Sequence, residues 1–246
     1  YHSMFVFPFF FIIFTSIKDD NVCGDSNYDG TATWPRPGDW SSIQFGPSSI
    51  DGLTKLQNNI VRYGGSTGAV QTDAASPTIS GNLITLNSSY GIRIVNTSAP
   101  NTSTNFVLDN LEGGIKLETT SSPIISNSQF WGNSGYAIYL DSSCYPNLSG
   151  NTAYYNTFNG IRNTGTISFN QTWYADLPYV IESTMIINSG VTLTVQPGAV
   201  VKFNKGAIGL TVNGALVANG TDTAPITFTS IHDDMFGGDT NNNEGA

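Results

Sequence analysis

Polar and apolar positions between residues 77 and 168 repeat with a period of 23. Each copy starts with a proline, and fifteen positions later an isoleucine follows a small residue. Two positions beyond the isoleucine, the first three copies have another apolar residue, and a weaker copy covers residues 54–76. A constant period in this range predicts a solenoid in which every repeat forms one coil. The columns are Pro77, Pro100, Pro123 and Pro146, then Ile92, Ile115, Ile138 and Ile161.

The apolar segments of these repeats are of the β type. They read GIRI, GIKL and AIYL, and they are separated by Gly, Asn, Ser, Thr and Pro. No stretch has apolar residues at helical spacing over three turns. Short strands with turn residues between them predict a parallel β-helix. Each 23-residue coil then contains two or three strands, and successive coils stack about 4.8 Å apart.

An asparagine stands ten positions after each proline. Identical side-chain amides one strand spacing apart can hydrogen-bond along the stack, and asparagine tolerates the left-handed backbone of a sharp corner. We therefore expect a structural ladder, and the alternative is a row of polar turn residues. The column consists of Asn87, Asn110, Asn133 and Asn156, and a second column contains Asn59, Asn82, Asn105 and Asn151.

The pattern changes near residue 169. The runs VTLTV and GLTV repeat with a displacement of 17, and AVVKF, ALVA and ITFTS are further short apolar strands. We expect shorter coils with tight turns in residues 169–246, continuing the same core as the regular coils of residues 54–168.

The two ends of the chain resemble each other. Residues 13–29 align without gaps on residues 227–243, a displacement of 214. We therefore expect a first coil over residues 11–53, interrupted by an acidic loop at 18–40 whose prolines and glycines exclude regular structure, and a second acidic loop after ITFTS. Residues 1–10 have no counterpart, and they are expected to be a leader or a cap.

The run GVTLTVQPGAVVKF, followed by GLTVNGALVANGTDTAPITFTS and an acidic segment, resembles the right-handed parallel β-helix proteins of prokaryotic cell surfaces, in the pectate-lyase-like superfamily. The resemblance extends from about Phe11 to the end. It implies an all-β, right-handed parallel β-helix. It implies no single activity, because this fold carries lyases, hydrolases, adhesins and structural rods.

The amino-acid composition limits the expected location of the protein and the classes of partner that it can bind. Charged residues are only 11 % of the 246, and the abundance of Asn, Ser, Thr and Gly is typical of secreted β-structure. The net charge of −9 argues against nucleic acid and anionic membranes as partners. The apolar run from Phe5 to Phe14 is too short to cross a bilayer. We expect an extracellular or cell-surface protein without membrane insertion, and no disulfide between Cys23 and Cys144, which would lie several coils apart.

The acidic loops are candidate calcium sites. The first reads DSNYDG, which fits the first half of a calcium loop with oxygen ligands at alternate positions. The twelfth position is Arg36 in place of the glutamate of an EF-hand. Aspartate pairs before each loop could supply further oxygens, and the alternative is a solvated Asx-rich turn. The candidate ligands are Asp19, Asp20, Asp25, Asn27 and Asp29, with Asp233, Asp234, Asp239, Asn241 and Asn243 in the second copy.

One column on the regular coils is a candidate binding face for an anionic polysaccharide. Between the inward-facing apolar positions, Arg93, Lys116, Tyr139 and Arg162 should point outward at strand spacing. Glu118 and Asp141 lie on the same face, so the alternative is a solvated surface with cross-strand ion pairs. Trp131 is a candidate platform for stacking a sugar.

The resemblance also implies what an enzyme would need. Related lyases use carboxylate-bound calcium and a basic residue, and related hydrolases use clustered aspartates with a histidine and a lysine. This chain has only His2 and His232, and no Gly-His-Gly. We therefore expect a non-catalytic structural protein, and the alternative is a carbohydrate-binding or polysaccharide-degrading protein acting on anionic glycans.

The match between the two ends also bears on assembly. If the chain begins and ends at the same phase of one larger repeat, each end leaves an unpaired strand edge that can pair further. We expect head-to-tail stacking into a surface filament or adhesive fibre. The alternative is that the chain is one piece of a longer tandem array.

Overall fold

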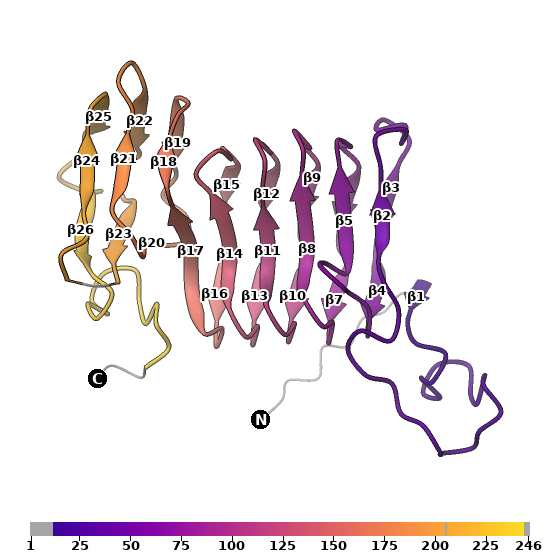
Figure 1. Ribbon diagram of the computed structural model, residues 1–246. Helices are drawn as coiled ribbons and strands as arrows, with labels where there is room; N and C mark the ends of the chain where they lie inside the picture. The colour runs from indigo at the N-terminus through magenta and orange to yellow at the C-terminus, as the bar shows by residue number, and fades with distance from the viewer. Residues whose placement is uncertain (1–11, 205, 244–246) are drawn as a thin grey trace.

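The computed structural model describes residues 12–204 and 206–243, which form 26 β-strands. The strands lie side by side as the rungs of a rod, and the two acidic loops project from the same side of it (Figure 1). None of these residues forms a helix long and apolar enough to cross a bilayer. The expected all-β parallel β-helix is confirmed. Residues 1–10, expected to be a leader or cap, and His2 among them lie outside the described residues.

Five parallel sheets make up the rod. One nine-stranded sheet, here called the long sheet, runs along the whole described rod. It consists of β2 (Ile43–Phe45), β5 (Val70–Asp73), β8 (Tyr90–Val95), β11 (Gly113–Leu117), β14 (Tyr136–Asp141), β17 (Phe158–Thr164), β20 (Tyr179–Ile181), β23 (Val200–Phe203) and β26 (Thr227–Ser230).

The regular coils add two further sheets. The six-stranded sheet consists of β1 (Ile12–Phe14), β4 (Asn59–Arg62), β7 (Leu83–Thr85), β10 (Phe106–Leu108), β13 (Gln129–Trp131) and β16 (Thr152–Tyr154). The five-stranded sheet consists of β3 (Lys55–Gln57), β6 (Thr78–Ser80), β9 (Asn101–Ser103), β12 (Ile124–Ser126) and β15 (Asn147–Ser149).

Two three-stranded sheets replace them in the C-terminal coils. One consists of β18 (Thr166–Ile167), β21 (Met185–Ile187) and β24 (Leu210–Val212). The other consists of β19 (Gln171–Trp173), β22 (Thr192–Val195) and β25 (Ala215–Ala218).

In the regular coils, residues 23 positions apart pair with each other on neighbouring strands. Ile115 pairs with Ile92 on one side and with Ile138 on the other, and all three are completely buried. Apolar residues at this phase therefore form a continuous column inside the rod. The core cluster continues from the regular coils through Ile167, Trp173 and Tyr179 into the C-terminal coils, so one core spans the change of coil shape.

Close packing between coils explains why a small residue precedes each buried isoleucine. A Cβ on Gly114 would lie 2.3 Å from the carbonyl oxygen of Ala137 and 2.5 Å from the ring of Phe130. Neither atom can move away cheaply, because one belongs to the next coil's backbone and the other to a completely buried ring. Adjacent coils therefore approach too closely for a side chain at Gly114, and alanine, at Ala137, is the largest residue in this column.

The asparagine column forms a hydrogen-bonded ladder inside the rod. The Nδ2 group of Asn87 donates to Asn110 Oδ1 at 2.8 Å, that of Asn110 to Asn133 Oδ1 at 3.0 Å, and that of Asn133 to Asn156 Oδ1 at 2.8 Å. All four side chains are buried. Asn156 in turn donates to Asn159 Oδ1 at 3.0 Å, which ends the ladder. Because each amide also satisfies backbone groups of its neighbours, the column stabilises the corners of successive coils.

The expectation of shorter coils in the C-terminal third is right only at its start. Ile161 pairs with Tyr179, a coil of 18 residues, but Thr192 pairs with Ala215 and Val200 with Thr227, coils of 23 and 27 residues. The 17-residue displacement between VTLTV and GLTV is not a coil, because β22 pairs with β25 and not with β24. Turn insertions lengthen these coils while the strand sequences stay alike.

The expectation that both ends lie at the same phase of one larger repeat is wrong. β1 belongs to the six-stranded sheet, whereas the matching β26 belongs to the long sheet. The shared sequence therefore specifies a strand followed by an acidic loop, but neighbouring strands decide which sheet it joins. Residues 13–29 and 227–243 are therefore similar in sequence but lie at different positions in their coils.

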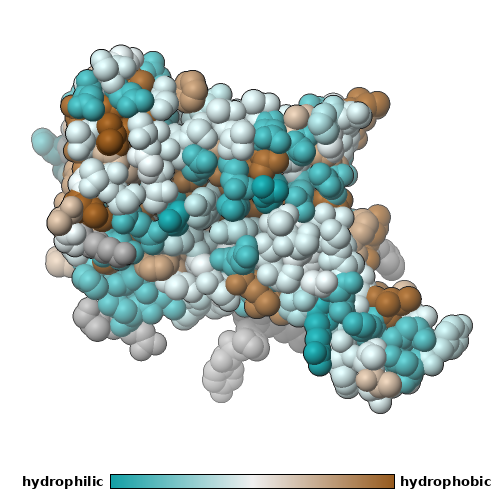
Figure 2. All heavy atoms as spheres, in the orientation of Figure 1, coloured by the Kyte–Doolittle hydropathy of each residue, from teal (hydrophilic) through white to brown (hydrophobic). Residues whose placement is uncertain are grey.

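The coil of β24, β25 and β26 is the last that the described residues form, and its interior is open. Val212 pairs with Ile187 and Phe228 with Val201, both completely buried. Val212 and Phe228 themselves are 44 % and 43 % exposed. Hydrophobic side chains are visible at this end of the rod in Figure 2. The buried apolar columns therefore end here in partly exposed side chains.

Candidate functional site

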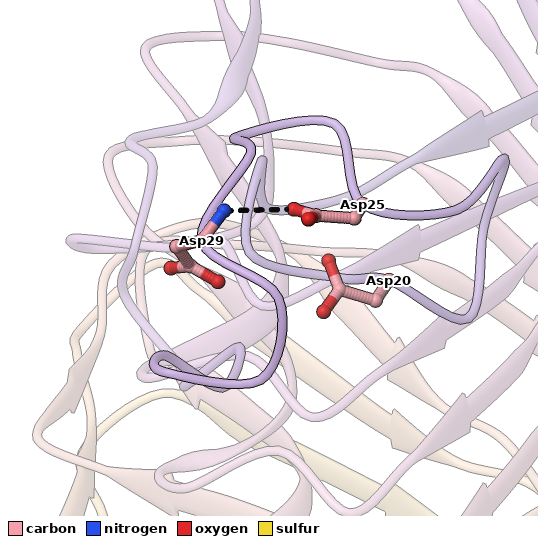
Figure 3. Close-up of side chains that lie close together, drawn as sticks. All are labelled: Asp20, Asp25 and Asp29. Carbon is pink, nitrogen blue, oxygen red and sulfur yellow. Dashed lines mark hydrogen bonds between the residues drawn. The ribbon is translucent and has the colours of Figure 1, made fainter.

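Three carboxylates of the first acidic loop converge on one point. Asp20, Asp25 and Asp29 each place an oxygen within 4.8 Å of the others. Figure 3 shows the carboxylates of Asp20 and Asp25 side by side, with that of Asp29 facing them. The loop holds this shape through Asp25, whose carboxylate accepts the backbone N–H groups of Asp29 at 3.1 Å and Gly30 at 2.9 Å.

Several oxygens of this loop are buried without a donor. Asn27 Nδ2 donates to Asp29 Oδ2 at 2.8 Å, while Asn27 Oδ1, Asp29 Oδ1 and Asp20 Oδ1 accept no hydrogen bond from any described residue. Buried acceptors without donors cost free energy unless another group, such as a cation, satisfies them.

The second acidic loop repeats this arrangement. Thr229 Oγ1 donates to Asp233 as Thr15 Oγ1 does to Asp19, and Asn243 N donates to Asp239 Oδ1 as Asp29 N does to Asp25 Oδ1. Among the described residues, Asp234 Oδ1 and Asn241 Oδ1 are again buried acceptors without a donor. They correspond to Asp20 and Asn27, so the same atoms lack donors in both copies.

This donor set fits calcium. Carboxylate and amide oxygens are the ligands that calcium prefers. Loss of hydration raises the pKa of Asp20, and the negative charges of Asp25, Asp29 and Asp19 raise it further, so a cation at this point would relieve repulsion. Asp19 is not one of the three converging residues, because its Oδ2 pairs with Arg62 at 2.5 Å.

The expected basic column is present on the long sheet. Arg93, Lys116, Tyr139 and Arg162 pair in consecutive registers on β8, β11, β14 and β17. Figure 2 shows hydrophilic side chains across the middle of this face. Each cation has a carboxylate partner: Glu118 accepts from Arg93 at 2.7 Å and from Lys116 at 3.0 Å, and Glu182 accepts from Arg162 at 2.5 Å.

Aromatic contacts also hold the cations of this column. Arg162 lies 4.6 Å and Lys116 5.2 Å from the ring centre of Tyr139. Although burial opposes it, hydrogen bonds from Lys116 and Arg93 lower the pKa of Glu118. The column is therefore a paired network of charges, and an anionic ligand would have to compete with its carboxylates.

Trp131 lies elsewhere, on the six-stranded sheet. It is in register with Tyr154, and its ring centre lies 4.4 Å from that of Tyr155. The two tyrosines line a cleft of 540 Å³ between β16 and the second acidic loop, and Trp131 packs behind Tyr155 without lining it. The structure thus brings Trp131 together with two tyrosines, and not with the basic column.

A family model described as a right handed beta helix region matches residues 41–173. The chain belongs to the right-handed β-helix family. Comparisons with curated proteins and with solved structures give no match. Membership of the β-helix family establishes the fold, and the function has to be argued from the sites themselves.

Several residues of these sites could not be found from the repeats of the β-helix. Lys202 is completely buried under the second acidic loop and donates to the carbonyl oxygen of Gly238 at 2.7 Å. Asp176 accepts from Asn151 Nδ2 at 2.7 Å and ends the second asparagine column. Both lie after residue 169, where the 23-residue phase no longer aligns positions, so only the three-dimensional stack identifies them.

Proposed function

We propose that this β-helix is a non-catalytic structural protein of the cell surface or extracellular space, a rigid rod that assembles end to end. The open coil of β24, β25 and β26 carries the proposal. Its inward-facing side chains continue the buried core columns but are half exposed. No described strand pairs with the outer edges of β24, β25 and β26, and exposed apolar side chains beside such edges favour a further layer of strands.

A second copy of the chain is the proposed partner at this surface. The long sheet begins with β2 and ends with β26. Because all its strands are parallel, β26 of one copy can pair with β2 of the next and continue the sheet. This is a head-to-tail contact, which does not close and therefore builds a filament. Low charge content and abundant Asn, Ser, Thr and Gly support the extracellular location.

Calcium is the proposed ligand of the two acidic loops. Asp20, Asp25, Asn27 and Asp29 would hold it in the first loop, and Asp234, Asp239, Asn241 and Asn243 in the second. The ion would supply structural stabilisation, because oxygens from separate turns of one loop would be fixed on one centre. The acceptors that lack donors in both copies support this assignment.

The alternative function is binding or cleavage of an anionic glycan on the basic column. The ion pairs of Arg93, Lys116 and Arg162 weigh against it, because their charges are already compensated. Incubation with polygalacturonate, followed by analysis for new reducing ends or unsaturated products, tests this alternative. Turnover that Lys116→Ala or Arg162→Ala abolishes would contradict a purely structural role.

Electron microscopy of the purified protein tests the assembly. When β26 pairs with β2 of the next copy, each subunit contributes nine strand spacings to the long sheet, which correspond to about 43 Å of axial length. We expect fibres with a subunit rise of about that length. Particles that stay single at high protein concentration would contradict the proposal.

A further inference from the structure

A cleft lies between strand β16 and the second acidic loop, next to the pair of Trp131 and Tyr155. Its volume of 540 Å³ lies within the range of small-ligand sites. Its lining residues come from strand β16 and the residues around it, from Asp176 and its neighbours, and from the second acidic loop. Three segments far apart in the sequence therefore meet here.

The cleft exists because the coil changes shape at this point. Strand β16 is the last strand of the six-stranded sheet, and the next coil continues in another sheet with β19. The second acidic loop docks against the open side, because Asn159 N donates to the carbonyl oxygen of Thr240 at 2.7 Å and Asn159 Nδ2 to that of Asp239 at 3.0 Å. In Figure 1 this loop lies beside the lower ends of β17 and β20.

The wall on the β16 side is aromatic and exposed. Tyr154 and Tyr155 line the cleft and are 54 % and 62 % exposed, and Trp131, at 46 %, packs against Tyr155. Tyr155 has a backbone φ of 56°, which is uncommon for a tyrosine. This left-handed conformation at the end of β16 places two consecutive tyrosines at one edge, where an ordinary strand would alternate them.

The other walls provide hydrogen-bonding groups without positive charge. Asn242 supplies an amide, and Asp176 and Asp239 supply carboxylates. Asn151 and Asn159 also line the cleft, but their side-chain amides already donate to Asp176 and to the carbonyl oxygen of Asp239. Burial raises the pKa of Asp176, although hydrogen bonds from Asn151 oppose the shift. No lysine or arginine is among the described residues that line the cleft. With a net charge of −9 on the chain, the cleft disfavours anions.

We propose that this cleft binds a neutral oligosaccharide. The face of a pyranose ring presents weakly positive C–H groups, which pack on the negative faces of aromatic rings. Its hydroxyl groups can donate to the carboxylates and exchange hydrogen bonds with the amide of Asn242. Both kinds of group are present among the residues that line the cleft. The site is distinct from the basic column, shares Asp239 with the second proposed calcium loop, and does not depend on assembly into filaments.

Binding is tested by isothermal titration calorimetry and tryptophan fluorescence. The probes are hexasaccharides of glucose, mannose and N-acetylglucosamine, with polygalacturonate as the anionic comparison. We expect at least one neutral hexasaccharide to bind and to change the tryptophan emission, because Trp131 packs against Tyr155 of the cleft. Tyr155→Ala should then raise the dissociation constant by about tenfold or more, because a stacking surface is lost.

Two further variants keep the test specific. Asn242→Ala removes an amide that the second acidic loop contributes to the cleft and should also weaken binding, even where Tyr155→Ala perturbs folding. Tyr145→Ala removes a tyrosine of similar exposure, 45 %, that does not line the cleft, and should leave binding unchanged. The proposal would be overturned if no neutral probe binds at millimolar concentration, if polygalacturonate binds better, or if both cleft variants bind like the unaltered protein.

Discussion

Asn110 illustrates how one side chain joins three coils. Its Nδ2 donates to the carbonyl oxygen of Ile84 at 3.1 Å and to Asn133 Oδ1 at 3.0 Å. Its Oδ1 accepts from Asn87 Nδ2 at 2.8 Å and from the Asn87 backbone at 3.3 Å. We expect Asn110→Ala to lower the free energy of unfolding by about 2–4 kcal/mol, because buried partners lose their hydrogen bonds.

Urea denaturation of Asn110→Ala beside Asn101→Ala measures this effect. Asn101 is an exposed asparagine in the neighbouring strand β9, so its removal should change stability by no more than about 0.5 kcal/mol. Equal losses in the two variants would show that the ladder does not stabilise the rod.

Asp39 makes the first acidic loop sensitive to acid. Although burial opposes it, hydrogen bonds from Lys18 and Ser16 lower the pKa of Asp39 to about 2. A carboxyl whose pKa is lower in the folded state stabilises that state above its unfolded value of 3.8. This stabilisation is lost as the pH falls from about 4 to about 2.

The titration of Asp39 can be followed by NMR. Lys18→Met removes the ion pair at 2.8 Å and should move the pKa of Asp39 upward toward 3.8, with earlier opening of the loop as the solution is acidified. An unchanged pKa in Lys18→Met would refute the role of this pair.

At the scale of the element, the two acidic loops should respond to calcium as units. We expect chelation to lower the melting temperature and to increase proteolysis within residues 18–40, while the coils survive. An ion that binds only the native state at a hundredfold excess over its dissociation constant contributes about 2.7 kcal/mol.

Matched variants separate calcium from general charge effects in that experiment. The double variant Asp25→Asn and Asp29→Asn should abolish the response of residues 18–40 to chelator. Asp222→Asn, at an exposed aspartate outside the converging carboxylates, should retain it. If chelator leaves the protease pattern of the unaltered protein unchanged, the loops do not bind calcium and are solvated Asx-rich turns.

The sequence predicts the regular elements well because every coil meets the same environment. Ile92, Ile115 and Ile138 recur every 23 residues since each packs on the next. Past residue 169 the turns vary in length while strands stay alike, so matching VTLTV to GLTV misassigns the coil. The cleft could not be predicted, because its three walls meet only through long-range docking of the second loop at Asn159.

At the scale of the whole molecule, the rod is a stack in which each coil covers the one before it. Interior columns such as Ile187 and Val201 are completely buried because Val212 and Phe228 lie over them. In a solenoid of this kind, stability depends on interfaces between neighbouring coils. The coil of β24, β25 and β26 has only one such interface within the described residues, so a second copy would bury apolar surface there.

Sedimentation velocity over a range of protein concentrations, on two variants of strand β24, tests this account most directly. Val212→Lys places a charge on the inward-facing column of the open coil, whereas Thr211→Lys places it on the adjacent outward-facing position. We expect Val212→Lys to remain monomeric while Thr211→Lys and the unaltered protein form growing end-to-end species. A monomer in all three proteins, or unchanged assembly of a folded Val212→Lys, would contradict the account.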